Sequence, residues 1–403
     1  MDTHNNAQDA VILSAVRTPI GRYQGALAGL SATQLGAAVV EAAVERAGID
    51  PERIDEVLMG NVISAGVGQA PARQAALFGG LPNTIPATTI NKVCGSGLKA
   101  CMLGAQAIRA GDADVIVAGG MESMSNAPHL LRGRSGLRFG TQQLEDALLH
   151  DGLLDPFENW AMGMAAEYIA EKYEVTREAM DRWAVGSHEK AIAAADGGKF
   201  TEEITPVHVP SKNGKVLVGE DETPRRDTSL ERLASLIPAF TPDGRVTAGN
   251  APGLNDGASA VVLASRRAAK DMGLRPLARV LAYTQAAVPP KELFIAPARA
   301  VPRLLQKLSW RFADVDLIEL NEAFAAQVLA DGYAMLEEGW DWDWEKVNVN
   351  GGAIALGHPV GASGARVLTT LLYALRDRGR RTGVASLCLG GGEAVAMAVE
   401  LED

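Results

Sequence analysis

The sequence has few cysteines, no histidine clusters and no excess of basic charge, and each shortage excludes a class of protein. Its 403 residues include three cysteines, which form neither a disulfide framework nor a CxxC zinc pattern: Cys94, Cys101 and Cys388. We therefore expect free thiols. The six histidines show no HExxH or clustered spacing, so we expect no structural or catalytic metal.

The chain also lacks any apolar run approaching the roughly 18 residues that a membrane-spanning helix needs. Lysine and arginine number 38 against 49 acidic residues, and the net charge is −11 at pH 7. This balance gives no general attraction to nucleic acid or to an anionic membrane. The N-terminal residues resemble neither a secretory signal nor a transit peptide. We expect a cytoplasmic protein with neither nucleic acid nor a membrane as partner.

Glycine and apolar residues are abundant. The 43 glycines occur in short clusters, and 47% of the residues are hydrophobic, enough for a large core. Short β-branched runs, such as 56–60 and 114–120, alternate with helical patterns, which predicts a layered α/β fold. Ser31 and Gln34 form a capping box and Gly48 a stop signal, which predicts a helix between them.

Two halves of the chain repeat one plan, which predicts a duplicated fold. Residues 112–123 resemble residues 314–325, and residues 89–108 and 347–372 both have the pattern of a strand, a glycine-rich turn and a helix. Between the halves, roughly residues 123–248 are rich in charge, proline and glycine. We expect this segment to be an inserted, loop-rich excursion that provides substrate or subunit contacts.

Cys94 is the first candidate for chemistry. It precedes a helical pattern in NKVCGSGLKA, where unpaired backbone N–H groups and the helix dipole favour an anion. A lowered pKa and a nucleophilic thiolate are therefore expected. A small buried apolar role is the alternative for a lone cysteine. This buried apolar role suits Cys101 better than Cys94, because glycine and serine surround Cys94.

Two further motifs contain polar residues among glycines. His358 lies in GGAIALGHPVGASG, and its imidazole could take a thiol proton; a satisfied core histidine is an equally good interpretation. Cys388 lies in SLCLGGGEAVAMAVE, which predicts a hairpin. Its glycines either present backbone N–H donors for an oxyanion or serve only a tight turn.

Together these motifs resemble those of the thiolase family over essentially the whole chain. The counterparts are NKVCGSGLKA, NEAFA, GGAIALGHPVGASG and CLGGG, with GNVISAGVGQAPARQAA, AGGMESMSNAPHLL and VTAGNAPGLNDGA as further stretches. The resemblance implies a duplicated five-layer αβαβα fold with an inserted loop domain. It implies an N-terminal half (1–122 and 249–275), a loop domain for CoA binding and oligomer contacts (123–248), and a C-terminal half (276–403).

The resemblance also implies an activity, which is reversible Claisen condensation of two acetyl-CoA to acetoacetyl-CoA and CoA, or thiolysis of a 3-oxoacyl-CoA. Cys94 is expected to become acylated after His358 takes its proton, and Cys388 to act as base in condensation and acid in thiolysis. His358 and a water held by Asn321 are expected at the enolate oxygen. The N–H groups of Cys94 and Gly390 are expected at the acyl-enzyme oxygen. CoA thioesters are the substrates and no cofactor is implied.

The resemblance places CoA at six positions, which are Arg225 near the adenine and phosphates, Ala248 and Gly249 along the pantetheine, and Met162, Ala323 and Phe324 beside the acyl group. Other positions depart from the family pattern. Pro252, Ala161 and Arg232 replace a common serine, histidine and serine, and Leu293 and Phe294 replace a methionine and a glycine of acetoacetyl-specific members. The sequence therefore leaves undecided whether one hydrogen bond to the pantetheine forms and how large the acyl pocket is.

Acetyl-CoA C-acetyltransferase activity is the favoured interpretation, and several alternatives stay open. One is a longer-chain 3-ketoacyl-CoA thiolase (acetyl-CoA C-acyltransferase) of β-oxidation. A non-catalytic acyl-CoA or lipid-binding relative should lack a catalytic residue, a ketosynthase should use two histidines, and a cysteine hydrolase needs a directed water. Family members with an excursion like LRGRSGLRFG often form tetramers, so a homodimer or a dimer of dimers is expected.

Overall fold

A ten-stranded mixed sheet forms the centre of the computed structural model, which describes residues 7–137 and 139–402. Within these residues no helix is long and apolar enough to cross a membrane. From one edge to the other the strands are β4 (Ala87–Ile90), β3 (Glu56–Gly60), β5 (Val115–Ser123), β12 (Asn255–Ser265), β1 (Ala10–Arg17), β13 (Ala278–Ala287), β16 (Glu393–Leu401), β15 (Thr382–Leu389) and β14 (Leu317–Leu320). The short β2 (Gly21–Arg22) pairs with β12.

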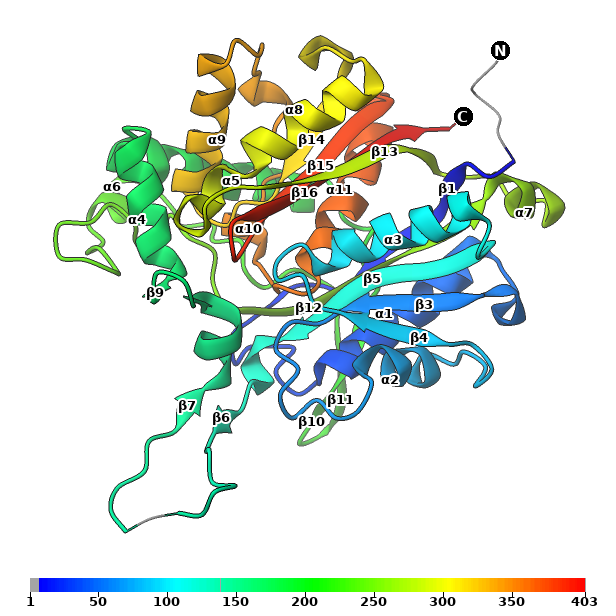
Figure 1. The fold of residues 1–403 in the computed structure, drawn as a ribbon, viewed down its shortest axis with the longest axis horizontal. Helices are drawn as coiled ribbons and strands as arrows, with labels where there is room; N and C mark the ends of the chain where they lie inside the picture. Colours follow the sequence, from blue (N-terminus) through cyan, green and yellow to red (C-terminus); the bar gives the residue numbers. More distant parts are fainter. Residues whose placement is uncertain (1–6, 138, 403) are drawn as a thin grey trace.

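The helices and the strands of the two halves of this sheet stack alternately in five layers (Figure 1). The outer layer of the N-terminal half contains α1 (Ala32–Ala47) and α2 (Pro71–Phe78), and the outer layer of the C-terminal half contains α8 (Pro297–Leu308) and α9 (Ala325–Glu337). The middle layer consists of α3 (Ser96–Ala110) and α11 (Ser363–Asp377), whose apolar residues form one core with strands of both halves. The predicted αβαβα architecture is therefore confirmed.

Both halves arrange their strands in the same order. One half pairs β1 with β12, β12 with β5 and β5 with β3, and the other pairs β13 with β16, β16 with β15 and β15 with β14. In the first half, β4 follows at the edge beside β3. Its counterpart is reduced to an isolated bridge between Ile318 and Val347.

This order corrects one of the two predicted repeats. Residues 112–123 contain β5, whose counterpart is β15, whereas residues 314–325 contain β14, whose counterpart is β3, so the two segments are not structural counterparts. The likeness arose because both are buried apolar strands followed by acidic and small residues. The other pair, 89–108 and 347–372, does occupy equivalent places, although the short α10 (Ala353–Leu356) is added before α11.

Local signals in the sequence account well for the first helix. The capping box of Ser31 and Gln34 is present at the start of α1, and Gly48 ends it in the left-handed region with φ +65°. The remaining short elements of the two halves are η1 (Pro51–Arg53), α7 (Arg266–Asp271), η4 (Pro290–Ile295), η5 (Phe312–Asp314) and η6 (Trp344–Lys346).

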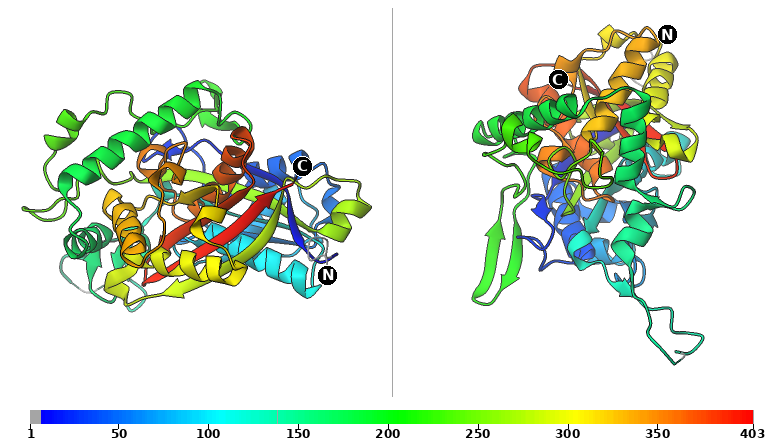
Figure 2. Two further views of the ribbon diagram at one scale, coloured as in Figure 1. Left: turned by 90° about the horizontal axis from the view of Figure 1, so that it is seen from above. Right: turned by 90° about the vertical axis from the view of Figure 1, so that its left-hand side faces the viewer.

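The chain leaves the sheet after β5 and returns to it at β12. The elements between are η2 (Met124–Asn126), β6 (His129–Leu130), β7 (Glu145–Asp146), η3 (Leu148–Leu153), β8 (Leu154–Asp155), β9 (Trp160–Ala161), α4 (Met162–Lys172), α5 (Arg177–Asp196), β10 (Val207–Ser211), β11 (Gly214–Val218) and α6 (Leu230–Ala234). The β6–β7 excursion and the β10–β11 hairpin project from the body (Figure 2). Helices α4 and α5 make the segment less loop-rich than expected. The domain boundaries stay a prediction.

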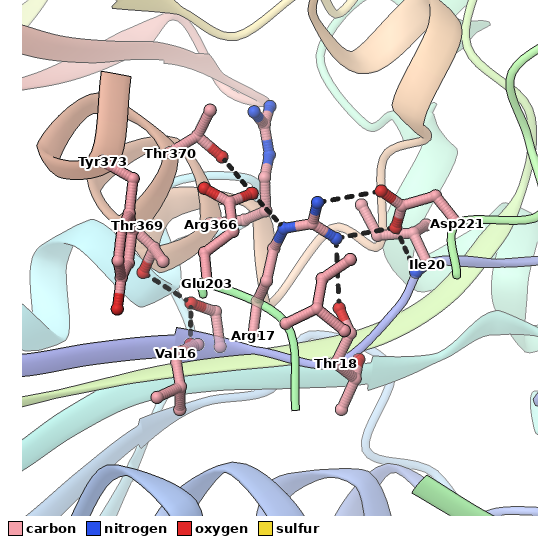
Figure 3. Close-up of polar contacts among 12 residues, drawn as sticks. Val16, Arg17, Thr18, Ile20, Glu203, Asp221, Arg366, Thr369, Thr370 and Tyr373 are labelled. Atoms are coloured by element: carbon pink, nitrogen blue, oxygen red, sulfur yellow. Dashed lines mark hydrogen bonds and ion pairs between the residues drawn. The ribbon is translucent and has the colours of Figure 1, made fainter. Parts of the chain in front are cut away.

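A buried ion cluster ties this segment to the sheet (Figure 3). The Arg17 guanidinium at the end of β1 donates to Glu203 Oε1 at 2.6 Å and to both carboxylate oxygens of Asp221 at 2.6 and 2.8 Å. Thr370 on α11 donates to the same Glu203 oxygen at 3.2 Å. Since removing one member of a buried pair leaves an uncompensated charge, the cluster holds β1, α11 and the inserted segment together.

The two middle helices touch through glycine. A Cβ at Gly97 of α3 would lie 2.6 Å from the backbone nitrogen of Ala365, and a Cβ at Gly364 of α11 would overlap the backbone nitrogen of Leu98. Only glycine permits this contact between backbones. Cys94 is two residues before α3 and His358 five residues before α11, so the crossing brings the two loops together.

We predict that Gly97→Ala and Gly364→Ala each lower the free energy of unfolding by about 1–3 kcal/mol, because the added methyl group forces apart two packed backbones. Gly186→Ala, within α5 and with open space around its Cα, is the control and should raise it by about 0.5–1 kcal/mol. Denaturant unfolding measures both effects. Equal stability of all three variants would contradict the crossing.

Candidate active site

Three residues singled out in the sequence meet in one cavity. Cys94, His358 and Cys388 line a cavity of about 200 Å³ whose other walls are mainly apolar. Gly390 belongs to the same wall, as do three residues expected beside an acyl group: Met162, Ala323 and Phe324. The cavity therefore joins residues from the N-terminal half, the inserted segment and the C-terminal half.

A second cavity of about 210 Å³ shares wall residues with the first. The shared residues are Ala251, Gly253 and Leu254. Its own walls include the other three residues expected at CoA, which are Arg225, Ala248 and Gly249. All six positions therefore line one of two adjoining cavities, the second of which is the more polar.

The Cys94 loop lies against the strand that contains Cys388. Val93 adopts φ +46°, and Gly95 is the N-cap of α3. A Cβ at Gly95 would overlap the Leu389 side chain, so glycine lets the loop approach the end of β15 without displacing that leucine. The predicted hairpin of β15 and β16 is confirmed, and Gly391 and Gly392 form its turn with φ values of +86° and +87°.

The expectation of a lowered pKa for Cys94 is wrong. Burial raises the pKa of this thiol to about 12, and the backbone N–H groups of Cys94 and Gly390 only partly oppose the rise. The helix N-terminus is present, but desolvation of a thiolate in an apolar cavity outweighs it. Cys94 therefore rests as a neutral thiol and needs a base to become a nucleophile.

His358 is the candidate for that base, and hydrogen bonds fix its ring. Ser363 Oγ donates to the Pro359 carbonyl at 2.9 Å and therefore accepts from His358 Nδ1 at 2.6 Å. The proton thus resides on Nδ1, and Nε2 is the basic nitrogen, 3.4 Å from Asn321 Nδ2. The His358 backbone N–H donates to Asn255 Oδ1 at 2.8 Å. The structure thus brings Asn321 to the imidazole.

Burial keeps the whole site uncharged at rest. Desolvation and the nearby Arg366 charge lower the pKa of His358 to about 3, so the ring is neutral. Desolvation, with smaller contributions from the neighbouring Cys94 and Asp331 side chains, raises the pKa of Cys388 well above its usual value. Two neutral thiols and one neutral imidazole form a site in which charge arises only as a proton moves.

A buried carboxylate next to Asn321 was missed in the sequence. Glu322 accepts hydrogen bonds from Trp183 Nε1 and Asn348 Nδ2 at one oxygen, and from Ser187 Oγ and the Ile354 N–H at the other, at 2.7–3.1 Å. It thereby fixes the asparagine loop against α5 and α10. Its partners lie up to 139 residues away, so no local motif could have identified them.

His188 on α5 was also missed. It lines the second cavity, and its Nδ1 accepts the backbone N–H of Arg225 at 3.1 Å. Burial and the Arg225 charge lower the pKa of His188 to about 4. A neutral ring whose Nδ1 accepts must have its proton on Nε2. Nε2 is therefore a hydrogen-bond donor.

The departures from the family pattern lie in different places. Pro252, Ala161, Leu293 and Phe294 line the first cavity, whereas Arg232 lines neither cavity and pairs with Asp227. Phe294 packs edge-on against Phe324, with ring centroids 5.3 Å apart. Phe240 packs on the other side at 6.5 Å. Three aromatic rings thus form one wall of the site.

The described part of the chain contains no group of three or more His, Cys, Asp or Glu residues able to hold a metal ion. What the site offers is a thiol nucleophile, a neutral base, a second thiol and backbone donors. These are the requirements of an enzyme that transfers acyl groups through cysteine.

Comparisons with known proteins agree with this class. Residues 10–267 match the thiolase N-terminal domain and residues 274–401 the thiolase C-terminal domain. The acetyl-CoA acetyltransferase of Pseudomonas aeruginosa is 54% identical, covering 97% of this chain and 98% of its own length. That of Cupriavidus necator is 53% identical, with 97% and 99% covered. The chain belongs to the thiolase family.

Solved structures give the same result. The crystal structure of the Bacillus anthracis acetyl-CoA acetyltransferase superposes with a TM-score of 0.94 at 44% identity, covering 98% of this chain and 99% of the other. The acetyl-CoA acetyltransferase from Syntrophomonas wolfei gives 0.96 at 43% identity with the same coverage. The predicted family, fold class and acyltransferase class are confirmed.

We predict that iodoacetamide labels Cys94 about tenfold faster for each pH unit between about 7 and 9, because the thiolate fraction of a high-pKa thiol rises tenfold per unit. Peptide mass spectrometry measures the rate, with the buried Cys101 as an unlabelled internal control. A labelling rate already constant above about pH 6 would show a thiolate at rest and contradict the neutral site.

Proposed function

We propose that this protein is an acetyl-CoA acetyltransferase, which condenses two acetyl-CoA to acetoacetyl-CoA and CoA and catalyses the reverse thiolysis. One observation carries the proposal: Cys94, His358 and Cys388 line one apolar cavity, which adjoins a polar cavity lined by the expected CoA residues. The names of relatives at about 50% identity over nearly the whole chain support this activity.

The first step is acylation of Cys94. The sulfur attacks the acetyl-CoA carbonyl as His358 Nε2 takes its proton, so that no free thiolate has to form in the apolar cavity. A carbon–sulfur bond forms to Cys94 and the bond to CoA breaks. The departing CoA sulfur takes a proton from Cys388, which leaves Cys388 as a thiolate beside the acyl group.

The second step is formation of the carbon–carbon bond. The Cys388 thiolate removes the α-proton of a second acetyl-CoA, and the enolate attacks the Cys94 thioester. Cys94 leaves and recovers its proton from His358. Thiolysis is the reverse, and the raised pKa of Cys388 favours it there, because a thiol protonated at rest can donate to the leaving enolate.

Each step develops negative charge on a thioester oxygen, and each oxygen needs hydrogen-bond donors. We assign the enolate oxygen to protonated His358 and a water held by Asn321. We assign the acyl-enzyme oxygen to the N–H groups of Cys94 and Gly390. The effect of both N–H groups on the pKa of the Cys94 sulfur supports this assignment. One such donor is typically worth about 2.7–4 kcal/mol in a transition state.

CoA and its thioesters are the proposed ligands. The pantetheine arm passes Ala248 and Gly249 toward Cys94, while Arg225 and the His188 Nε2 donor face the polar end of the molecule. Pro252 lacks an N–H and a side-chain donor, so CoA binding here relies on the remaining contacts. The reaction transfers acyl groups between sulfur and carbon, so we propose no metal and no redox cofactor.

An oligomer and a cytoplasmic location complete the proposal. β4 is a sheet edge, which offers backbone groups to a second subunit, and Leu77 and Phe78 are exposed on the neighbouring α2. The β6–β7 excursion exposes Leu131, Leu137 and Leu144, which favours a dimer of dimers. Three free cysteines suit a reducing compartment.

Substituting each of the two cavity thiols in turn should separate the two half-reactions. Cys94→Ala is expected to abolish the covalent acyl-enzyme, since the other thiol in the cavity, Cys388, has a pKa well above its usual value and serves as acid and base in the proposed reaction. Cys388→Ala should still acquire an acetyl group on Cys94 but fail to form acetoacetyl-CoA. Intact-protein mass spectrometry detects the acyl group, and a coupled assay detects the product. Normal condensation by Cys388→Ala would overturn its assignment as base.

The dependence of kcat/KM on the acyl chain length of the substrate tests whether the aromatic wall limits the size of the cavity. The kcat/KM for acetoacetyl-CoA should exceed that for 3-oxohexanoyl-CoA at least about tenfold, because extra methylenes meet Phe294 and Phe324. Phe294→Ala should narrow this ratio. Phe312→Leu, which alters a buried ring packed on Trp342 outside both cavities, should leave it unchanged. Faster turnover of substrates of about six to sixteen carbons would instead favour a longer-chain thiolase.

A further inference from the structure

Glu122 is a fully buried carboxylate for which the proposed chemistry has no use. It lies near the end of β5 and is 0% exposed. Oε1 accepts from Asn61 Nδ2 at 2.8 Å and from the Ile63 N–H at 3.2 Å, and Oε2 accepts from the N–H groups of Val62 and Gly361 at 3.0 Å each. One side chain thus satisfies four donors.

These donors come from two distant parts of the chain. Asn61, Val62 and Ile63 follow β3 in the N-terminal half, and Gly361 lies three residues beyond His358 in the C-terminal half. The carboxylate therefore joins the loop after β3 to the loop that contains the proposed base. Among the hydrogen bonds described here, no other side chain holds the Gly361 N–H.

The other side of the histidine loop is held by close backbone contact. The Gly361 carbonyl lies against Gly60, Gly97 and Gly120, where a Cβ would come within 3.2 Å of it or overlap it. Three glycines set how far the loop can move toward α3 and β5. Glu122 supplies the hydrogen bond that pulls it to that limit. Contact alone limits only how close the loop can come, whereas the hydrogen bond to the carboxylate also limits how far it can move away.

We propose that Glu122 is a positioning residue for His358, whose ionised carboxylate clamps the histidine loop so that Nε2 stays aligned with Cys94. The inference rests on the proposed function, because it presumes that His358 moves the Cys94 proton. It differs from a purely structural role in one respect: misalignment must slow the chemical step before it weakens binding of CoA. A displacement of about 1 Å can cost 10²-fold in rate.

The charge state of Glu122 gives a second consequence. Burial raises the pKa of Glu122 to about 7, Asp256 on β12 adds to the rise, and the backbone donors oppose it. Below this pH the group is protonated, and one oxygen then carries a hydrogen that faces N–H donors. Activity should therefore fall as pH drops through about 7, whereas His358, with a pKa of about 3, stays neutral there.

The test compares Glu122→Gln with Asp316→Asn in the full-length protein. Asp316 is a matched control, because its carboxylate also accepts two backbone N–H groups, those of Arg381 and Thr382 at 2.9 and 3.0 Å, at the opposite end of β15. For acetoacetyl-CoA thiolysis, Glu122→Gln should lower kcat about 10²-fold with KM changed less than about threefold, and its kcat should lose the fall below neutral pH. Asp316→Asn should keep both the rate and the profile.

Asn61→Ser is the milder second variant in case Glu122→Gln fails to fold. It removes one donor from the ionised carboxylate, so the pKa of Glu122 rises and the acid fall in kcat should move to higher pH. An unchanged profile in a folded Asn61→Ser, or a normal kcat in Glu122→Gln, overturns the clamp. If the unmodified protein does not cleave acetoacetyl-CoA at all, the proposed function fails instead.

Discussion

The contact between α3 and α11 at Gly97 and Gly364 is the constraint on which the site depends. Each helix begins just after a loop that contains a reactive side chain, so the distance between helix backbones sets the distance between Cys94 and His358. Duplication makes this possible, since both helices occupy equivalent places in the two halves and share one apolar core. The active site is a property of the interface between the two repeats.

Around that contact, buried carboxylates hold the loops in place by accepting several hydrogen bonds each. Glu122 binds four donors and Glu322 another four, and each joins segments that are distant in the sequence. Such groups cost desolvation unless every lone pair is used. Four of the eight donors are backbone amides, those of Val62, Ile63, Gly361 and Ile354, and the carboxylates also remove the cost of leaving these amides unpaired. The loops are fixed without any charge entering the cavity itself.

Motifs pointed to the three side chains that line one cavity because their glycine-rich surroundings are local. The residues around Cys94, His358 and Cys388 could be interpreted one stretch at a time, as could the capping box of α1. The polarity of the space around each side chain could not be predicted from one stretch of sequence. The helix N-terminus at Cys94 suggested a thiolate, but the apolar walls that reverse the expectation come from three segments far apart in the chain. The false repeat at 112–123 shows the same limit, because two buried strands look alike whatever their place in a sheet.

The hydrocarbon walls of the first cavity have a consequence for the lifetime of the acyl-enzyme. Hydrolysis of a thioester requires a water molecule oriented by an acceptor, and on the aromatic side of the cavity, away from His358, the rings of Phe240, Phe294 and Phe324 provide none. A stored acetyl group is therefore shielded from wasteful loss while it waits for the next acceptor. The same aromatic surface that limits the size of the substrate also excludes water on that side. In the proposed reaction, this lets a covalent intermediate persist between two separate binding events.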